Sequence, residues 1–233
     1  MQNKKHRFSI CIPTWEQNGV GAQYLRELLV SIKNQSFQDY EVVVSDHSKN
    51  DDIFNLWYSW GGQFEKFVYV RNEDDYGNGP ANTNNAIKNA NGEIIKIMFQ
   101  DDLMCSPECL ELIDKTFSED TTWLVNGYNH TTDGKNFFRA DIPCWNENII
   151  RGVNTIGSPS VLSFRREVKN LFDKNLVMLM DVEFYYGMFL KYGLPTLMPR
   201  ILVANRQHDE QISSKYSGNI DEEIQYVIHK YNL

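Results

Sequence analysis

Two adjacent carboxylates, Asp101 and Asp102, follow an apolar run at 94–99 that is interrupted only by Lys96. Neighbouring like charges repel each other, so the pair costs stability unless a cation compensates it. A divalent metal ion that bridges to a diphosphate would make the two carboxylates favourable. The structural alternative is a turn in which both aspartates are solvated. Taken alone, the pair favours that alternative.

Polar side chains also follow two earlier apolar runs of the chain. Thr14 and Glu16 come after the run at 8–13, and Asp46 ends the run at 40–46. Ligands of an open parallel sheet bind beyond the carboxyl ends of its strands, so these residues and the aspartate pair are expected at one edge. Their convergence favours a metal-dependent site over a solvated turn.

The elements that must position these residues alternate between strand and helix in the first half of the chain. Apolar runs predict strands, and apolar residues recurring every three or four positions predict helices. We expect strands at 8–13, 40–46, 66–72 and 93–99, and helices at 24–32, 51–60 and 80–90. Continuous apolar strands separated by helices indicate a parallel sheet that is covered on both faces.

The second half of the chain follows a different pattern. We expect a helix opened by Ser106 and Pro107, short strands at 122–129, 136–142 and 158–164, a helix at 181–193, a strand at 195–204 and a last helix at 220–231. There is no linker or repeat. The sequence therefore predicts one α/β domain over residues 1–233. Its first part, to about residue 105, binds a ligand, and the rest, from about residue 106, completes the site.

Composition and charge exclude several classes of protein. The chain has 233 residues, 42% of them apolar, and a net charge of −8, which argues against general binding of nucleic acid. No apolar run approaches the roughly 20 residues that span a bilayer, and no secretory signal is recognisable. The four cysteines include no CxxC pair. We therefore expect a reduced, cytoplasmic protein, with peripheral contact to a membrane through the apolar stripe of the last helix as a further option.

Six stretches, taken in order, resemble one known family. They are FSICIPTWEQ, LLVSIKNQSF, YEVVVSDHSKND and NNAIKNANGEIIKIMFQDD in the first half, then GSPSVLSFRRE and DVEFYYGMFLKYG. From about Ser9 to Ser213 the chain is similar to family-2 glycosyltransferases of the GT-A fold. That fold is a Rossmann-like, mostly parallel sheet flanked by helices, with a mixed C-terminal half. The resemblance implies transfer of a sugar from a nucleotide-diphosphate sugar to an acceptor hydroxyl, with inversion of the anomeric configuration.

The resemblance also implies roles for the residues at the sheet edge. Thr14 and Glu16 would border the nucleotide base, and Asp46 would accept hydrogen bonds from the base or its ribose. Asp101 and Asp102 would be this chain's form of the DxD motif, with Asp101 near the ribose and Asp102 holding Mn²⁺ or Mg²⁺.

Three further residues are candidates for the donor side of the site. His208, in NRQHDEQIS, would reach the metal or the diphosphate. Arg71 would reach a donor phosphate, or pair with Asp74 and Asp75. Asn85 would contribute to donor binding from the third helix.

Transfer to a hydroxyl requires a general base opposite the leaving group. By the resemblance it lies at the start of the helix at 181–193, which offers Asp181 and Glu183. Residues two apart do not share a helix face, so only one is expected to face the acceptor. Asp181 matches the first acid of the family's usual acidic pair, and Val182 replaces the second, which favours Asp181. Asp181 could also cap the helix.

Two other functions compete with this interpretation. A catalytically silent subunit would bind a sugar nucleotide but lack a usable base. A nucleotidyltransferase would need a basic, glycine-rich loop near the N-terminus, and PTWEQNGVG contains no Lys or Arg. For the enzyme, the expected acceptor is a saccharide or a lipid-linked or protein-linked glycan.

Overall fold

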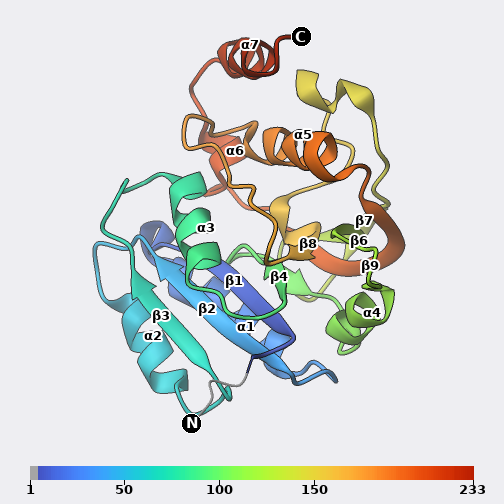
Figure 1. Ribbon diagram of the computed structural model, residues 1–233. Helices are drawn as coiled ribbons and strands as arrows, with labels where there is room; N and C mark the ends of the chain where they lie inside the picture. Colours follow the sequence, from blue (N-terminus) through green and yellow to red (C-terminus); the bar gives the residue numbers. More distant parts are fainter. Residues whose placement is uncertain (1–4) are drawn as a thin grey trace.

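Four parallel strands form the first half of one sheet. The structure is a computed structural model that describes residues 5–233. These strands run in the order β3 (Phe67–Arg71), β2 (Tyr40–Asp46), β1 (Phe8–Thr14) and β4 (Ile94–Ile97). Between them along the chain come η1 (Gln17–Gly19), α1 (Gly21–Lys33), α2 (Asp52–Trp60) and α3 (Gly79–Lys88). Figure 1 shows α3 lying in front of β1 and β2.

The second half of the chain continues the same sheet in mixed orientation. Beyond β4 come β8 (Leu162–Arg165), β6 (Trp123–Thr131), β9 (Thr196–Arg206) and β5 (Leu103–Met104), and β7 (Phe138–Asp141) pairs with β6. The helices of this half are α4 (Cys109–Thr116), η2 (Glu147–Arg151), η3 (Pro159–Val161), α5 (Met180–Tyr192), α6 (Ile212–Lys215) and α7 (Ile220–Tyr231). The expected parallel sheet with a mixed C-terminal half is confirmed.

The sheet has a hydrophobic core on each face. Phe8, Ile10 and Ile12 of β1 belong to one core, which α1, α2 and α4 close. Cys11, between them, belongs to the other core, which α3, α5 and α7 close. Alternate side chains of a strand point to opposite faces, so unbroken apolar strands are what two such cores require.

The observed elements follow the expected ones in order, with several differences. The strand expected at 158–164 begins at Leu162, after η3, and η1 and η2 were not expected. The helix expected from Ser106 begins at Cys109, and the Ser106 hydroxyl instead accepts a hydrogen bond from the Glu108 N–H at 3.3 Å. The strand expected to end at Ala204 continues to Arg206. Two short elements, β5 and α6, were not expected. β5 is defined by its antiparallel pairing with β9, which no local pattern reveals.

Lys96 joins the two halves of the sheet from within the core. Its side chain is fully buried, and its ammonium group donates to the carbonyl of Ser160. It also lies 3.5 Å from the carbonyl of Leu162 and from Asn126 Oδ1. Burial lowers the pKa of Lys96 to about 7, although the nearby charge of Asp102 opposes that shift. A buried lysine therefore lies within electrostatic reach of Asp102.

Candidate active site

Asp101 and His208 meet at the carboxyl edge of the sheet. Asp101 lies in the loop after β4 and His208 in the segment after β9, with 2.9 Å between Asp101 Oδ2 and His208 Nε2. The two side chains are 18% and 9% exposed. The ring of Tyr24 lies 5.0 Å from the imidazole, and Gln17 Nε2 lies 3.4 Å from His208 Nε2. A carboxylate and an imidazole are thus brought together near the surface.

Asp102 points into the protein instead. Its Oδ1 accepts from the backbone N–H of Arg206 at 3.0 Å, and its Oδ2 accepts from Asn205 Nδ2 at 2.8 Å. The residue is 4% exposed, and burial, together with the charge of Asp101, raises its pKa to about 7. Both Asp102 oxygens accept hydrogen bonds from β9, whereas Asp101 faces His208. The expected roles, with Asp102 on the metal and Asp101 near the ribose, stay predictions.

Arg206, which the sequence did not single out, holds the aspartate pair in place. Its side-chain Nε donates to the backbone carbonyl of Asp101 at 2.9 Å, in addition to its backbone bond with Asp102. The guanidinium is 3% exposed, pairs with Glu27 and lies 4.5 Å from the centre of the Tyr24 ring. These contacts from α1 and β9 fix the direction in which Asp101 points.

Gln100 connects the ends of β1 and β4. Its side-chain oxygen accepts from the Trp15 N–H at 2.9 Å, and its Nε2 donates to the Trp15 carbonyl at 3.1 Å and to Gln17 Oε1 at 2.8 Å. Gln100 stands beside the aspartate pair in FQDD, so its position in the motif was the one signal available.

Thr14 and Asp46 lie at the expected edge of the sheet, but their side chains are buried. Thr14 is 1% exposed, and its hydroxyl donates to the carbonyl of Ser45 at 3.1 Å. Asp46 has no exposed surface. Its oxygens accept from the Ser48 N–H at 2.8 Å and the Tyr69 hydroxyl at 2.7 Å. Both side chains thus organise the ends of β1 and β2. Their expected contacts with a base or ribose stay predictions.

Arg71 stabilises the loop after β2. Its guanidinium donates to the carbonyls of Ser48 and Asn50 at 2.9 and 3.1 Å, and pairs with Asp51 at 2.8 Å. Its Nε donates to the Tyr69 hydroxyl at 2.8 Å. Arg71 pairs with neither Asp74 nor Asp75. The expected pairing of Arg71 with Asp74 and Asp75 is therefore corrected, because its donors are engaged by this loop. Its contact with a donor phosphate stays a prediction.

Glu16 lies beside an exposed aromatic ring that the sequence reasoning missed. Glu16 Oε2 accepts from the Lys49 N–H at 3.2 Å, and its Oε1 is 3.5 Å from the Tyr76 hydroxyl. Tyr76 is 48% exposed, and the Lys49 ammonium lies 4.6 Å from the centre of its ring. A flat ring, a cation and a carboxylate near the end of β1 are suitable partners for a nucleobase. The role expected of Glu16 stays a prediction.

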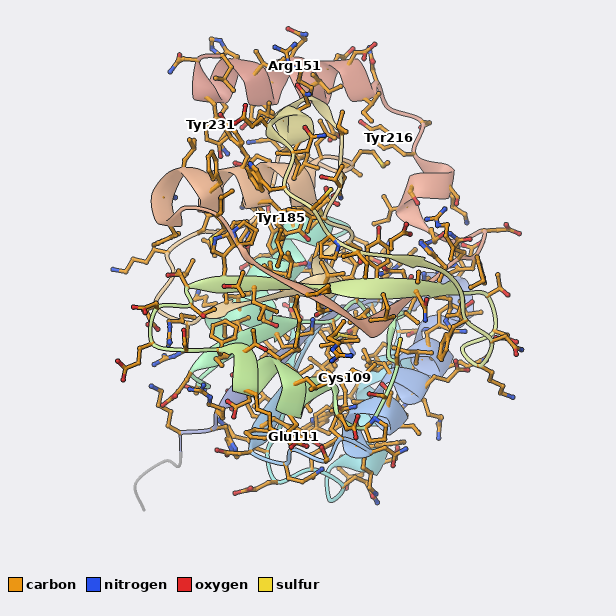
Figure 2. The ribbon with its side chains drawn as sticks, turned by 90° about the vertical axis from the view of Figure 1, so that its right-hand side faces the viewer. Cys109, Glu111, Arg151, Tyr185, Tyr216 and Tyr231 are labelled. Atoms are coloured by element: carbon orange, nitrogen blue, oxygen red, sulfur yellow. The ribbon has the colours of Figure 1, made fainter. Side chains whose placement is uncertain are left out.

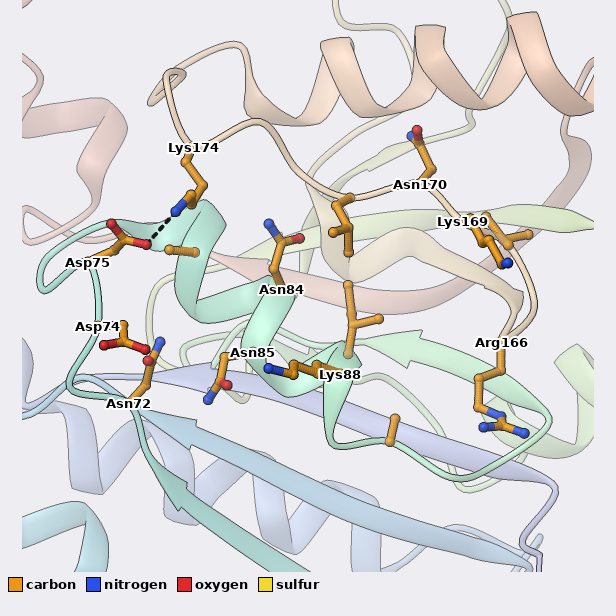
Figure 3. Close-up of a pocket in the computed structure, with 15 residues that line it drawn as sticks. Asn72, Asp74, Asp75, Asn84, Asn85, Lys88, Arg166, Lys169, Asn170 and Lys174 are labelled. Atoms are coloured by element: carbon orange, nitrogen blue, oxygen red, sulfur yellow. Dashed lines mark hydrogen bonds and ion pairs between the residues drawn. The ribbon is translucent and has the colours of Figure 1, made fainter.

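Asn85 lies on α3, between the sheet edge and a hollow of about 620 Å³. Its Nδ2 donates to the Ser45 hydroxyl at 2.9 Å. The hollow is bounded by α3 and the 166–174 segment, and its labelled lining includes Asn72, Asn84, Lys88, Arg166, Lys169, Asn170 and Lys174 (Figure 3). Of the predicted site residues only Asn85 lines it. The hollow therefore lies apart from the carboxylates of the candidate site.

Asp181 begins α5 and is only partly buried. Its Oδ2 accepts from Asn154 Nδ2 at 2.7 Å, and its Oδ1 accepts from the Val182 N–H at 2.7 Å. Removal from water raises the pKa of Asp181 to about 7. A carboxylate with that pKa can take up a proton near neutral pH, which is what a general base requires.

Glu183 faces the C-terminal helix rather than the sheet edge. It is 3% exposed, and its Oε1 accepts from the Tyr231 hydroxyl at 2.6 Å and from the Lys230 ammonium at 2.7 Å. Figure 2 shows Tyr231 between α7 and α5. Asp181 and Glu183 therefore lie on different faces of the helix, and Glu183 binds α7. This arrangement favours Asp181 over Glu183 as the candidate base, and the assignment stays a prediction.

A path of hydrogen bonds and one backbone step links Asp102 with Asp181. Asn205 donates to Asp102 and also to the Ser158 hydroxyl, the second bond being 2.6 Å long. The preceding residue, Gly157, accepts at its carbonyl from Asn154 Nδ2 at 3.1 Å, and Asn154 also binds Asp181. The 154–158 segment therefore places the two acidic sites relative to each other.

The residues present suit a divalent metal that is shared with a ligand. Carboxylate and imidazole both bind transition-metal ions, and the imidazole of His208 favours Mn²⁺ over Mg²⁺. Within residues 5–233, no group of three or more His, Cys, Asp or Glu is arranged to hold a metal by itself. Asp101 and His208 would thus need oxygen atoms from a ligand to complete a coordination shell. None of the helices in the described part of the chain is long and apolar enough to cross a membrane.

Comparisons with known proteins identify the family of this chain. The family model for glycosyl transferase family 2 matches residues 9–178. A Campylobacter jejuni protein named GalNAc(5)-diNAcBac-PP-undecaprenol beta-1,3-glucosyltransferase is 29% identical over 110 residues. That match covers 47% of this chain and 34% of the relative, so the alignment spans about a third of the relative's length.

Two solved structures share the fold. S. aureus TarS 1-349 in complex with UDP-GlcNAc has a TM-score of 0.68 at 18% identity, over 96% of this chain and 65% of TarS 1-349. The mannosyltransferase PcManGT from Pyrobaculum calidifontis, in complex with GDP-Man and Mn²⁺, has a TM-score of 0.63 at 16% identity, over 87% of this chain and 57% of PcManGT. With the family model matching most of its length, the chain is a GT-A-fold glycosyltransferase that belongs to glycosyl transferase family 2.

Proposed function

We propose that the protein transfers a sugar from a nucleotide-diphosphate sugar to an acceptor hydroxyl with inversion of configuration, assisted by a divalent metal. The observation that carries this proposal is the linked pair of acidic sites. Asp102, the chain neighbour of Asp101, stands at one end of the path through Asn205 and the 154–158 segment, and Asp181 stands at the other. Asp101 itself pairs with His208. One site suits a diphosphate and its metal, and the other suits an acceptor.

On the donor side, Asp101 and His208 would hold the metal. When bound, the metal neutralises the charge that develops on the leaving diphosphate. Asp102 and Arg206 would position Asp101 rather than touch the ion, because both are buried behind it. Outer partners of this kind orient metal ligands and affect metal affinity. Tyr76, Lys49 and Glu16 would surround the base.

On the acceptor side, Asp181 would act as general base. The acceptor oxygen forms a bond to the anomeric carbon while the bond from that carbon to the diphosphate oxygen breaks. The hydroxyl proton passes to Asp181, and the electron pair of the broken bond leaves with the nucleoside diphosphate. Asn154, which donates to Asp181 Oδ2, would orient the carboxylate for this transfer.

The acceptor proposed is a glycan hydroxyl, whether on a free saccharide, a lipid-linked glycan or a protein-linked glycan. The name of the Campylobacter jejuni relative, an undecaprenol-diphosphate glycosyltransferase, supports the lipid-linked class. A lipid-linked acceptor would bring a cytoplasmic enzyme to the membrane surface.

Calorimetry of UDP and GDP binding, with and without Mn²⁺, tests the donor side. The wild type should bind one of the two nucleotides more tightly with Mn²⁺. Asp101→Asn and His208→Gln should each lose that metal-dependent gain, a loss of about 10- to 100-fold in affinity. Asp102→Asn should keep most of it, because the amide oxygen of the new side chain can still accept one of the hydrogen bonds from β9.

Two outcomes would contradict this assignment. A loss of metal dependence in Asp102→Asn alone would return the metal to Asp102. Equal nucleotide affinity with and without Mn²⁺ in the wild type would rule out the metal-assisted mechanism. Lys115→Gln, an exposed change on α4, serves as the control that should leave binding unchanged.

A further inference from the structure

Tyr128 of β6 lies close to the proposed base. Its ring packs so tightly on Gly157 that a β-carbon at position 157 would come within 2.6 Å of Tyr128 Cε1. The carbonyl of Gly157 accepts from Asn154, which also binds Asp181. The charge of Asp181 is close enough to contribute to the raised pKa of Tyr128, although burial is the larger cause. The acceptor face of the site is therefore continuous from Asp181 to this ring.

The hydroxyl group of Tyr128 is available to a ligand. Tyr128 is half-buried, and its hydroxyl forms no hydrogen bond with any residue in the described part of the chain. A partly buried tyrosine hydroxyl ordinarily has a partner. The nearby hydroxyl of Tyr185 shows the contrast, because it donates to the Gly157 carbonyl at 3.1 Å.

The neighbouring strand β7 adds polar groups beside Tyr128. Asp141 pairs directly opposite Tyr128 in the antiparallel register. Arg139 Nε donates to Asp141 Oδ2 at 3.1 Å, and the Arg139 side chain is 62% exposed. Arg139 also has a left-handed backbone, with φ of 46°. Non-glycine residues in that conformation are strained, and such strain is concentrated at binding sites.

The charge and shape of this surface select a class of ligand. The Arg139 guanidinium is balanced by Asp141, so the surface attracts no strong anion. Phe138, which is 45% exposed, stacks on His130 with ring centres 6.0 Å apart, and His130 in turn binds Asp141 at 2.9 Å. Exposed aromatic carbon, next to paired donors and acceptors, suits a neutral polyhydroxylated ring.

We infer that Tyr128, Arg139 and Asp141 form the binding surface for the sugar ring of the acceptor, with the Tyr128 hydroxyl as a hydrogen-bond partner of that ring. The inference rests on the proposed function, because it extends the acceptor side of the same site. Tyr128 would determine which acceptor sugar is accepted, and Asp181 would remove the proton from its hydroxyl. Phe138 would cover one edge of the ring.

Saturation-transfer NMR with two probes, methyl β-glucoside and methyl N-acetyl-β-galactosaminide, tests this surface in the presence of UDP and Mn²⁺. The wild type should bind at least one of them. Tyr128→Phe, which removes only the hydroxyl, should raise its dissociation constant by about 10-fold, and Arg139→Gln by a similar factor. UDP affinity should not change in either variant. Tyr58→Phe, an exposed tyrosine on α2, is the matched control and should bind the probe as the wild type does.

A second variant and the measurement of UDP binding distinguish failure of this inference from failure of the proposed function. Gly157→Ala should abolish probe binding, because the new methyl group displaces the Tyr128 ring, and retained UDP binding would show that the variant is folded. The inference is overturned if the wild type binds neither probe, or if Tyr128→Phe and Arg139→Gln bind it as tightly as the wild type. A wild type that does not bind UDP in the presence of Mn²⁺ would instead overturn the proposed function. Once an acceptor is known, Tyr128→Phe should raise its KM and leave the donor KM unchanged.

Discussion

At the scale of single residues, the direction in which a side chain points matters more for its role than its position in the sequence. Asp101 and Asp102 are adjacent, yet one reaches His208 and the other is enclosed by β9. Asp181 and Glu183 are two residues apart, yet one meets Asn154 and the other meets α7. In each pair, the outward-facing member is the one to which we assign chemistry.

Asp181→Asn tests the base directly. Asparagine keeps the shape of the side chain but cannot take the acceptor proton, so turnover should fall by about 10²- to 10⁴-fold while UDP affinity stays the same. Steady-state kinetics with a verified acceptor measure the effect. Asp120→Asn, at an exposed turn, should behave as the wild type. Unreduced turnover in Asp181→Asn would place the base outside α5.

The pH dependence of activity and stability should share one cause. The folded pKa of Asp181, about 7, lies above its ordinary value of 3.8. Turnover should therefore rise with pH up to about 7 and then level off. Between pH 4 and 7 the folded state binds more protons than the unfolded state, so Asp181 lowers the free energy of unfolding as pH rises.

Replacing Asp181 by a side chain that does not titrate should change the melting temperature by an amount that depends on pH. The melting temperature of Asp181→Asn should be about 2–4 °C above that of the wild type at pH 8 and close to it at pH 4. Thermal unfolding at both pH values measures the difference. A variant that melts below the wild type at pH 8 would show that the ionised carboxylate is stabilising, contrary to the pKa shift.

At the scale of elements, α7 is held to the acceptor half by acidic side chains. Glu223 accepts from the backbone N–H groups of Val177, Met178 and Leu179, at 2.9–3.3 Å. Glu183 binds Lys230 and Tyr231 of the same helix. The helix therefore supports the start of α5, where Asp181 lies. Its apolar stripe partly closes the core, since Val227 is fully buried.

Glu183→Gln separates this supporting role from catalysis. The substitution keeps the volume but removes the charge that pairs with Lys230, so the free energy of unfolding should fall by roughly 1–2 kcal/mol. Turnover of the folded protein should change by less than about threefold. Denaturant unfolding and kinetics on the same sample measure both effects. Glu222→Gln, at an exposed position of α7, should be nearly neutral in both. A large loss of turnover at unchanged stability would restore Glu183 as a candidate base.

At the scale of the whole molecule, one sheet unites the donor and acceptor halves, and Lys96 sits where they meet. β4 pairs with β8 through Lys96 and Ser163, and the ammonium group bonds to the carbonyl of Ser160. The same Ser160 accepts the Phe99 N–H at its hydroxyl, 2.8 Å away, just before the aspartate pair. The buried cation thus helps to connect the two halves behind the site.

The difference in the free energy of unfolding between the wild type and Lys96→Met, measured at several pH values, should show whether the Lys96 ammonium group is charged in the folded protein. The folded pKa of Lys96, about 7, lies below its ordinary value of 10.5, so between these values the unfolded state binds the extra proton. Lys96 therefore makes the free energy of unfolding rise with pH in this window, by up to about 1.4 kcal/mol per pH unit. The stability of the wild type relative to Lys96→Met should increase from pH 7 to pH 9, as measured by urea unfolding. A difference independent of pH would mean that Lys96 stays charged in the core.

The sequence by itself determined the order and type of nearly every element. Apolar runs and helical spacing depend on residues close together in the chain, so strands such as 40–46 and helices such as α5 could be predicted within a few residues. The carboxyl ends of β1, β2 and β4 also follow from that order, because parallel strands align their ends. The sheet edge and the aspartate pair were therefore predictable as a neighbourhood, whereas the position of the candidate base came from the resemblance to the family.

Only the tertiary structure decided which atoms face that neighbourhood. The roles of Asp101 and Asp102 depend on β9, which approaches from more than 100 residues away and takes both oxygens of Asp102. Arg71 binds its own loop, and Glu183 binds α7. The positions of these partners cannot be predicted from a local sequence pattern. Tyr128 becomes part of the acceptor face only because Gly157 packs against its ring. Side-chain direction at the end of a strand or helix is set by long-range packing and hydrogen bonding, and these act only after the chain has folded.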